Sequence, residues 1–362
     1  MIWAVFSFLV LLFVHLGGLN GESGRKTIFY RVCLVLVLSV MTGLGSVVGQ
    51  DHYGYVQMYN GMQGFSSDVD FVSWFGQYSI EPGFEFLLFL GKTLHLSEPL
   101  FFFAMAVIMN SLFVAVIYRY PYPEIAILAL ILASIFAQET NILRQVLAVS
   151  VIVYSVKYLD VENRKPLWFI LGVIVAVTLH SSALVCILLL LTLFVKKTGA
   201  KQTYFWVFLV LWIMSLFVVV GLLRIPVLDS ISGVLANSRY SNYFSGNMDL
   251  GYGTYQVNYF YNCLMILVFF AMYKHLRIEL IIIAIGCIVQ NFSAEIAPLI
   301  RISLYFTTMM PLAIGMILSQ NNYDKHNRTF IVYARYLVYA FYIFTLVTKY
   351  ILGDPILGSK FY

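Results

Sequence analysis

The chain has 362 residues, of which 61% are hydrophobic and 11% are charged, and its formal net charge is +5. Soluble domains carry about 25% charged residues, and one soluble core could not bury so many apolar side chains. The composition therefore excludes an ordinary soluble protein. It predicts an all-α, polytopic transmembrane bundle that spans the membrane repeatedly.

Apolar runs predict about 12 membrane spans in a single integral-membrane domain covering residues 1–362. Residues 84–96 form a further apolar stretch, which is either a re-entrant or interfacial helix or a thirteenth span. The run 167–195 is too long for one span, and His180-Ser181-Ser182 near its middle predicts a tight hairpin tip. The predicted spans lie near residues 2–16, 29–48, 100–118, 124–137, 142–159, 167–179, 181–195, 204–223, 256–273, 278–292, 298–318 and 330–350.

The distribution of lysine and arginine predicts the orientation of these spans. Most of these residues lie in short loops that are all cytoplasmic if 84–96 does not cross the membrane. The longer segments 49–83 and 224–255 are then extracytoplasmic. On this topology the polar residues that are hardest to accommodate in a membrane fall at the outer face. We therefore predict one extracytoplasmic site near Asp51, Glu81, Glu139, Arg144, His180, Arg239, Glu295 and Arg301.

A polar segment that interrupts two apolar runs gives this site its centre. Asn141, Arg144 and Gln145 stand at i, i+3 and i+4, so they share one face of a helix. A guanidinium near lipid is costly and usually faces a bundle interior or a water-filled cavity. One interpretation is a snorkelling arginine or a structural pair with Glu139. The other is an anion-binding site at the mouth of the bundle.

Two carboxylates and one histidine are candidates for proton transfer. Asp51 follows a span, where it either caps a helix or orients a sugar hydroxyl. Glu81 precedes a Pro-Gly turn and could act as a hydrogen-bond acceptor or base. His180 is the side chain best matched to proton transfer near neutral pH, although a structural imidazole bonded to a backbone carbonyl is the alternative.

Aromatic and basic residues later in the chain add candidates for substrate binding. Arg239 and Tyr240 lie in a segment rich in Tyr and Gly, which is either a plain surface loop or a carbohydrate-binding surface. Arg301 and Tyr305 begin a late span one turn apart. Together with Arg144, Arg301 would supply a second guanidinium on the same side. Two guanidiniums can bind phosphate oxygens in a bidentate geometry that lysine cannot offer.

Several classes of chemistry have no support in the sequence. It contains no P-loop, Rossmann fingerprint or heme motif, so we expect no cofactor. Its basic residues form short clusters at membrane edges, which argues against nucleic-acid binding. No histidine, cysteine or carboxylate stands at metal-ligand spacing from His180. The four cysteines have no paired spacing, so we predict that they are small buried apolar residues. They are Cys33, Cys186, Cys263 and Cys287.

These motifs together resemble one known family. The pattern Asn141-x-x-Arg144-Gln145-x-x-Ala148, then His180-Ser181, then Arg301-x-x-x-Tyr305, resembles the EpsG-like polysaccharide polymerases. These are Wzy-type integral-membrane enzymes of bacterial surface-polysaccharide assembly. Asp51 and Glu81-Pro82-Gly83 match the pattern too, and the resemblance extends over residues 45–310.

The resemblance implies a glycosyltransferase that joins undecaprenyl-pyrophosphate-linked oligosaccharide repeats at the outer leaflet of the bacterial plasma membrane. The product would be an O-antigen, a capsule or an exopolysaccharide. Arg144 and Arg301, with Arg239 as a third candidate, would neutralise the pyrophosphate leaving group. His180, Glu81 or Asp51 would take the hydroxyl proton. Expected partners are the lipid-linked oligosaccharide, the bilayer, a chain-length regulator and a flippase.

Two other functions would use the same lipid-linked sugars. A flippase or transporter also binds pyrophosphate with arginines, but it needs access from both faces, and no inverted repeat emerges from the sequence. A membrane ligase or acyltransferase acting on the polymer is the second alternative. An acyltransferase needs a route for a cytoplasmic acyl donor, and the predicted inner loops are short.

Overall fold

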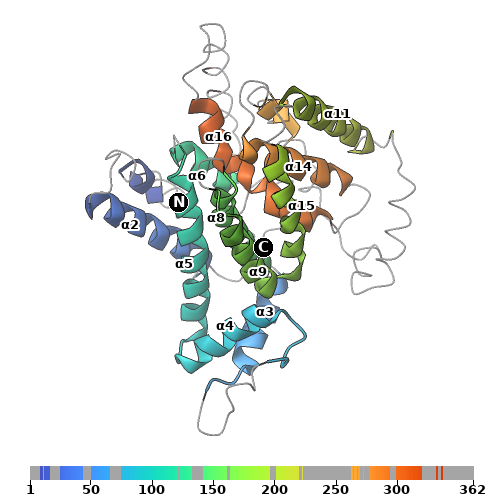
Figure 1. Ribbon diagram of the computed structural model, residues 1–362. Helices are drawn as coiled ribbons and strands as arrows, with labels where there is room; N and C mark the ends of the chain where they lie inside the picture. Colours follow the sequence, from blue (N-terminus) through green and yellow to red (C-terminus); the bar gives the residue numbers. More distant parts are fainter. Residues whose placement is uncertain are drawn as a thin grey trace.

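The computed structural model describes residues 25–43, 50–65, 75–120, 123–132, 142–160, 164–195, 201–219, 277–293 and 299–319, with shorter pieces in 9–16 and 262–272 and the single positions 222, 332 and 336. Within these ranges every regular element is a helix and no strand occurs, which confirms the predicted all-α fold. Figure 1 shows the arrangement of the helices. In chain order they are α2 (Arg25–Gly43), α3 (Gln50–Gly61), α4 (Pro82–Thr93), α5 (Glu98–Ile117), α6 (Pro123–Leu132), α8 (Leu143–Ser155), η1 (Val156–Tyr158), α9 (Pro166–Leu179), η3 (Ser181–Leu191), α10 (Thr192–Val195), α11 (Lys201–Val219), α14 (Ile278–Phe292), α15 (Leu299–Thr307) and α16 (Met309–Ser319).

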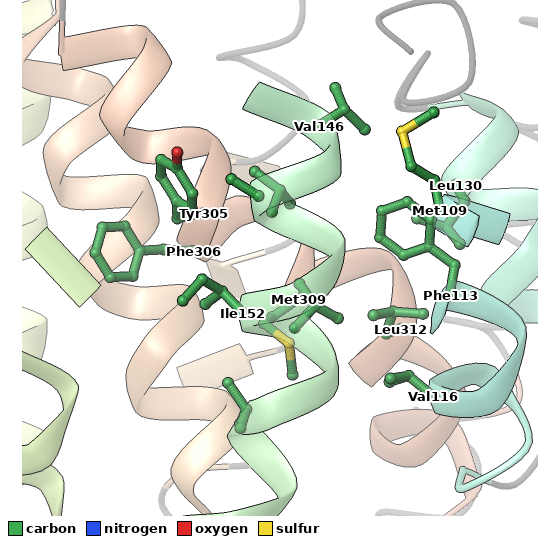
Figure 2. Packing of buried hydrophobic residues seen from close by; sticks show 14 of the residues in the cluster. Met109, Phe113, Val116, Leu130, Val146, Ile152, Tyr305, Phe306, Met309 and Leu312 are labelled. Carbon is green, nitrogen blue, oxygen red and sulfur yellow. The ribbon is translucent and has the colours of Figure 1, made fainter. Parts of the chain in front are cut away.

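Helix α8 forms the centre of the bundle. It packs against α5, α9, η3 and α15, and nearly every residue along it is buried. Figure 2 shows Val146 and Ile152 of α8 between Phe113 of α5 on one side and Tyr305 and Phe306 of α15 on the other. A helix that is apolar all round is stable only when neighbours cover every face. The first turn of α8, which carries Arg144, is therefore fixed by packing on several sides.

The outer helices expose apolar faces. On α9, Phe169, Val173 and Ala176 are buried on one side, whereas Leu167 is 74% exposed and Trp168 is 57% exposed. Helix α11, at the edge of the bundle beside α14, exposes a similar apolar face (Figure 1). Exposed apolar surface of this extent is unfavourable in water and is satisfied by lipid. The pattern is compatible with a membrane-embedded bundle.

By length and composition, one helix among the described residues is suited to crossing a bilayer, namely α5 with 20 residues. Several apolar helices are shorter, at 10–17 residues, including α9 and α14. A perpendicular crossing takes about 20 helical residues. The predicted number of about 12 spans and the single-domain organisation therefore stay predictions.

The stretch 84–96, predicted as either a re-entrant or interfacial helix or a thirteenth span, corresponds to α4, which begins at Pro82 and has 12 residues. A helix of this length is about 18 Å long, and the apolar core of a bilayer is about 30 Å thick. The length favours the alternative in which this stretch does not cross. Helices α3 and α4 lie together at one end of the molecule, where α4 packs against α9 (Figure 1).

The helical structure is interrupted at His180, where the sequence predicts a hairpin tip. Helix α9 ends at Leu179, His180 adopts an extended conformation with φ −156° and ψ 118°, and η3 begins at Ser181. Residues Ala183, Cys186 and Leu189 of η3 are buried at every third position, as a 3₁₀ helix requires. The predicted late span 298–318 is likewise two helices, α15 and α16, separated at Thr308.

Gly83 lets α4 approach α9 closely, and we predict that Gly83→Ala destabilises the protein. An added Cβ would lie 2.7 Å from the backbone oxygen of Thr178, which cannot rotate away. Overpacking of this kind costs about 1–3 kcal/mol, so thermal unfolding in detergent should begin at a lower temperature.

Gly54→Ala in α3 is the matched control, because nothing lies within 4 Å of its added Cβ. Alanine is favoured over glycine inside a helix by about 0.5–1 kcal/mol, so this variant should be unchanged or slightly more stable. Equal melting temperatures for the two variants would contradict the close approach of α4 and α9.

Candidate functional site

An ion pair between Glu81 and Arg144 joins the start of α4 to the start of α8. Arg144 Nη1 donates to Glu81 Oε2 over 2.5 Å, and the side chains are 23% and 14% exposed, respectively. The other carboxylate oxygen, Oε1, accepts from both the backbone N–H and the hydroxyl of Ser181, each at 3.0 Å. Glu81 therefore ties α4 and α8 to the first residue of η3. Both of its oxygens are engaged.

A second carboxylate, Glu85, holds the segment that leads into α4. Its side chain is 1% exposed, and it accepts from the backbone N–H groups of Gly76 and Tyr78 at 2.8 and 2.6 Å. Gly76 has φ +79°, a left-handed conformation in which a side chain would be strained. By closing this turn on the first turn of α4, Glu85 fixes the position from which Glu81 projects.

His180 is tied to α15 through Ser182. The His180 Nδ1 atom accepts from the Ser182 backbone N–H at 3.3 Å and lies 2.7 Å from the Ser182 hydroxyl. That hydroxyl is 3.1 Å from the hydroxyl of Tyr305, which is 0% exposed. His180 thus caps η3, and Tyr305 lies in a buried layer behind it.

Arg301 and Asp51 form a looser pair at the same site. Arg301 Nη2 lies 4.0 Å from Asp51 Oδ2, and the side chains are 35% and 44% exposed. Asp51 stands in the first turn of α3, where a negative charge is favourable for the helix dipole. Gln145 Nε2 donates to the backbone oxygen of Arg301 over 2.5 Å, which links α8 to the first turn of α15.

The environment of Arg144 favours a negatively charged ligand. Arg144 lies in the first turn of α8, and the N-cap residue Ile142 supplies no side-chain acceptor to the N–H groups of that turn. The Arg144 guanidinium carbon lies 5.9 Å from the centre of the Tyr55 ring. The buried Arg144 Nε has no hydrogen-bond partner among the described residues. A helix N-terminus and a guanidinium whose side chain is 23% exposed both favour an anion.

The contacts of Glu81 set its protonation. Burial alone raises the pKa of a carboxyl, but the Ser181 backbone N–H and the positive charge of Arg144 outweigh it. The net result is a Glu81 pKa below the ordinary value of 4.5. Glu81 is therefore a carboxylate at neutral pH. A lowered pKa and two occupied oxygens make it a weak proton acceptor.

A pH series is expected to show this coupling. Because folding lowers the pKa of Glu81, the stabilising effect of its charge is complete above the unfolded-state pKa of about 4.5 and is lost as the pH falls through the folded-state value. Glu81→Gln should be less stable than wild type at pH 7, and the difference in melting temperature should shrink below about pH 4.5. As the control, Glu98→Gln removes a carboxylate that accepts from Asn60 at 3.2 Å. A Glu81→Gln difference that is unchanged down to pH 3, about 1.5 units lower, would contradict the assignment.

The structure brings together seven of the residues predicted from the sequence. Five of them, namely Asp51, Glu81, Arg144, His180 and Arg301, are partly exposed around the site. Gln145 and Tyr305 are buried, at 1% and 0% exposure, so they support the site from behind instead of lining it. Asn141, Arg239, Tyr240, Glu139 and Glu295 lie outside the described residues.

Four other residues contribute to the site without having been predicted to do so. Ser181, Ser182 and Glu85 hold His180 and Glu81 in place, and Tyr55 contacts Arg144. The spacing of Tyr55 four residues after Asp51 is a signal that could have found it, because the two share one face of α3. Glu85, likewise, stands four residues after Glu81.

Comparison with known proteins identifies the family of this chain. Residues 28–357 match the sequence model of the EpsG family. The chain belongs to the EpsG family. No curated protein and no solved structure gives a significant match. EpsG membership associates the chain with polysaccharide biosynthesis and with membranes, in agreement with the resemblance and the hydropathy.

Proposed function

We propose that this EpsG-family protein polymerises undecaprenyl-pyrophosphate-linked oligosaccharide repeat units into a surface polysaccharide at the outer leaflet of the plasma membrane. The observation that carries the proposal is the convergence of two arginines, Arg144 from α8 and Arg301 from α15, with two carboxylates and a histidine. Gln145 links the two arginines through the Arg301 backbone. A pair of guanidiniums suits a pyrophosphate leaving group, and a carboxylate suits the proton of a sugar hydroxyl.

The reaction is a glycosyl transfer. A hydroxyl oxygen on the non-reducing sugar of the incoming unit forms a bond to the anomeric carbon of the growing chain. The bond from that carbon to the pyrophosphate oxygen breaks, and the undecaprenyl pyrophosphate leaves with the electron pair. The hydroxyl proton passes to a carboxylate. Because the donor is already activated, the transfer needs no nucleotide.

The two carboxylates differ in what they can contribute. Both oxygens of Glu81 accept hydrogen bonds from Arg144 and Ser181, and the Glu81 side chain is 14% exposed. Asp51 is 44% exposed and lies 4.0 Å from Arg301. We assign the proton-accepting role to Asp51 and a positioning role to Glu81. Glu81 holds Arg144 and the start of η3 in fixed positions relative to each other.

The arginines stabilise the leaving group in this proposal. The Arg144 side chain is 23% exposed and the Arg301 side chain is 35% exposed, so both guanidiniums can meet a ligand. Fixed donors that meet developing negative charge are worth about 10²- to 10³-fold in rate each. The exposed apolar faces of α9 and α11 would lie against lipid, where the polyprenyl tails of both substrates are soluble.

A deletion strain tests this function. It is complemented with the wild-type protein, an empty vector or the Arg144→Ala variant at matched protein levels, and the surface glycan is resolved by chain length. We expect a polymer ladder with the wild type and single repeat units with the other two. Loss of even single units from the surface, with lipid-linked sugar retained inside, would overturn the polymerase and indicate a flippase.

A further inference from the structure

The hydrogen bonds around His180 determine which ring nitrogen carries its proton. The Ser182 backbone N–H points at His180 Nδ1 from 3.3 Å, and a backbone N–H can only donate. Nδ1 must therefore present its lone pair. A neutral imidazole carries one proton, so the proton of His180 is on Nε2.

A chain of hydroxyl groups supports the same state from behind. With Nδ1 as an acceptor, the Ser182 hydroxyl, 2.7 Å away, donates to it. The Ser182 oxygen is then available to accept from the Tyr305 hydroxyl, 3.1 Å away. Tyr305 is 0% exposed and lies among the buried side chains between α15 and α8 (Figure 2). The position of Tyr305 is fixed by packing, so this side chain is the rigid end of the series of hydrogen-bonded hydroxyl groups.

We propose that Ser182 and Tyr305 are positioning residues that hold His180 Nδ1 as an acceptor, so that the ring meets the substrate pyrophosphate with an Nε2–H donor. The inference rests on the proposed polymerase function and assigns His180 a role within it. A ring in this state keeps its proton throughout the reaction. It stabilises negative charge on a phosphate oxygen by a charge-assisted hydrogen bond.

The same geometry excludes His180 as the general base. Nδ1 is occupied by two donors, and Nε2 already holds a proton, so neither nitrogen can take the proton of a sugar hydroxyl. That proton goes to Asp51, as assigned above. The site then divides into donors for the pyrophosphate, which are Arg144, Arg301 and His180, and one acceptor for the hydroxyl.

Two substitutions distinguish whether His180 acts as a hydrogen-bond donor or as a general base. Asparagine has its amide near the position of Nδ1, so it can cap η3 but has no atom near Nε2. Glutamine reaches further and supplies an N–H₂ donor near Nε2. We expect His180→Asn to lose about 10²- to 10³-fold in polymerisation rate, and His180→Gln to lose at most about tenfold.

Equal loss in the two variants, at equal protein levels, would overturn the donor role, because a general base is absent from both. The deletion strain separates this outcome from failure of the proposed function. If the deletion strain makes the same polymer ladder as the wild type, the polymerase proposal fails. If the deletion strain loses the ladder and the two variants are equally impaired, this inference alone fails.

The proton position can be measured without any activity. Protein labelled with ¹⁵N-histidine and reconstituted in bilayers is compared with His180→Asn by solid-state NMR, which identifies the His180 signals by their loss. We expect an unprotonated Nδ1 and a protonated Nε2 in the wild type. Ser182→Ala and Tyr305→Phe should broaden or shift these signals, and Ser182→Thr, which keeps the hydroxyl, should restore them. A protonated Nδ1 in the wild type would overturn the inference.

Discussion

Arg144→Met is expected to abolish polymer formation and to destabilise the protein. The substitution removes a donor from the proposed pyrophosphate site, and it leaves Glu81, which is 14% exposed, without its counter-ion. Removing one partner of a fully buried pair costs about 3–5 kcal/mol, and the partial exposure of this pair places the cost at or below that range. Thermal unfolding and the chain length of the surface glycan measure the two effects separately.

The double variant Arg144→Met with Glu81→Gln distinguishes a functional arginine from a structural one. It removes both charges of the pair, so most of the lost stability should return. Polymer should still be absent, because the guanidinium that meets the pyrophosphate is missing. Recovery of the polymer together with the stability would show that Arg144 acts only as the partner of Glu81.

Arg301→Ala should also have a large effect on polymerisation but, unlike Arg144→Met, only a small effect on stability. Arg301 and Asp51 are 4.0 Å apart and both are about one-third or more exposed, so their pair is worth at most about 1 kcal/mol. The loss of one anion-stabilising donor should lower the polymerisation rate by about 10²- to 10³-fold. Arg301→Lys should recover only part of this rate, because lysine lacks the planar fork.

Arg119→Ala is the matched control for this experiment. Arg119 is an exposed arginine just beyond the C-terminal end of α5, in a loop predicted to be cytoplasmic. Its removal should leave the polymer ladder unchanged. A full-length ladder from Arg301→Ala at normal protein level would contradict a role for Arg301 in binding pyrophosphate.

The helices were the part of this structure that sequence patterns predicted best. The predicted span 278–292 coincides with α14, and 167–179 differs from α9 by one residue. Long apolar runs bounded by polar residues or proline define such elements locally. The break at Thr308 was not predicted, although Pro311 in the run 298–318 is a signal for it, because its ring clashes with the carbonyl of Thr307 four residues earlier.

The contacts within the site depend on pairings that no local pattern encodes. Glu81 and Arg144 are 63 residues apart, and both were singled out, but their direct pairing was not predicted. Gln145 and Tyr305 have polar side chains of the kind that contact substrates, yet packing places them behind the site. The role of Ser182 depends on the extended backbone at His180, which turns Nδ1 toward the next residues. Such details follow from tertiary packing.

The most direct test uses the purified protein in lipid vesicles with lipid-linked repeat units extracted from the deletion strain. We expect wild-type protein to elongate these units and to release one undecaprenyl pyrophosphate for each linkage formed. The Arg144→Met/Glu81→Gln variant, which should be folded, should form no linkage. If the wild-type protein moves the units between leaflets without lengthening them, it is a flippase and not a polymerase.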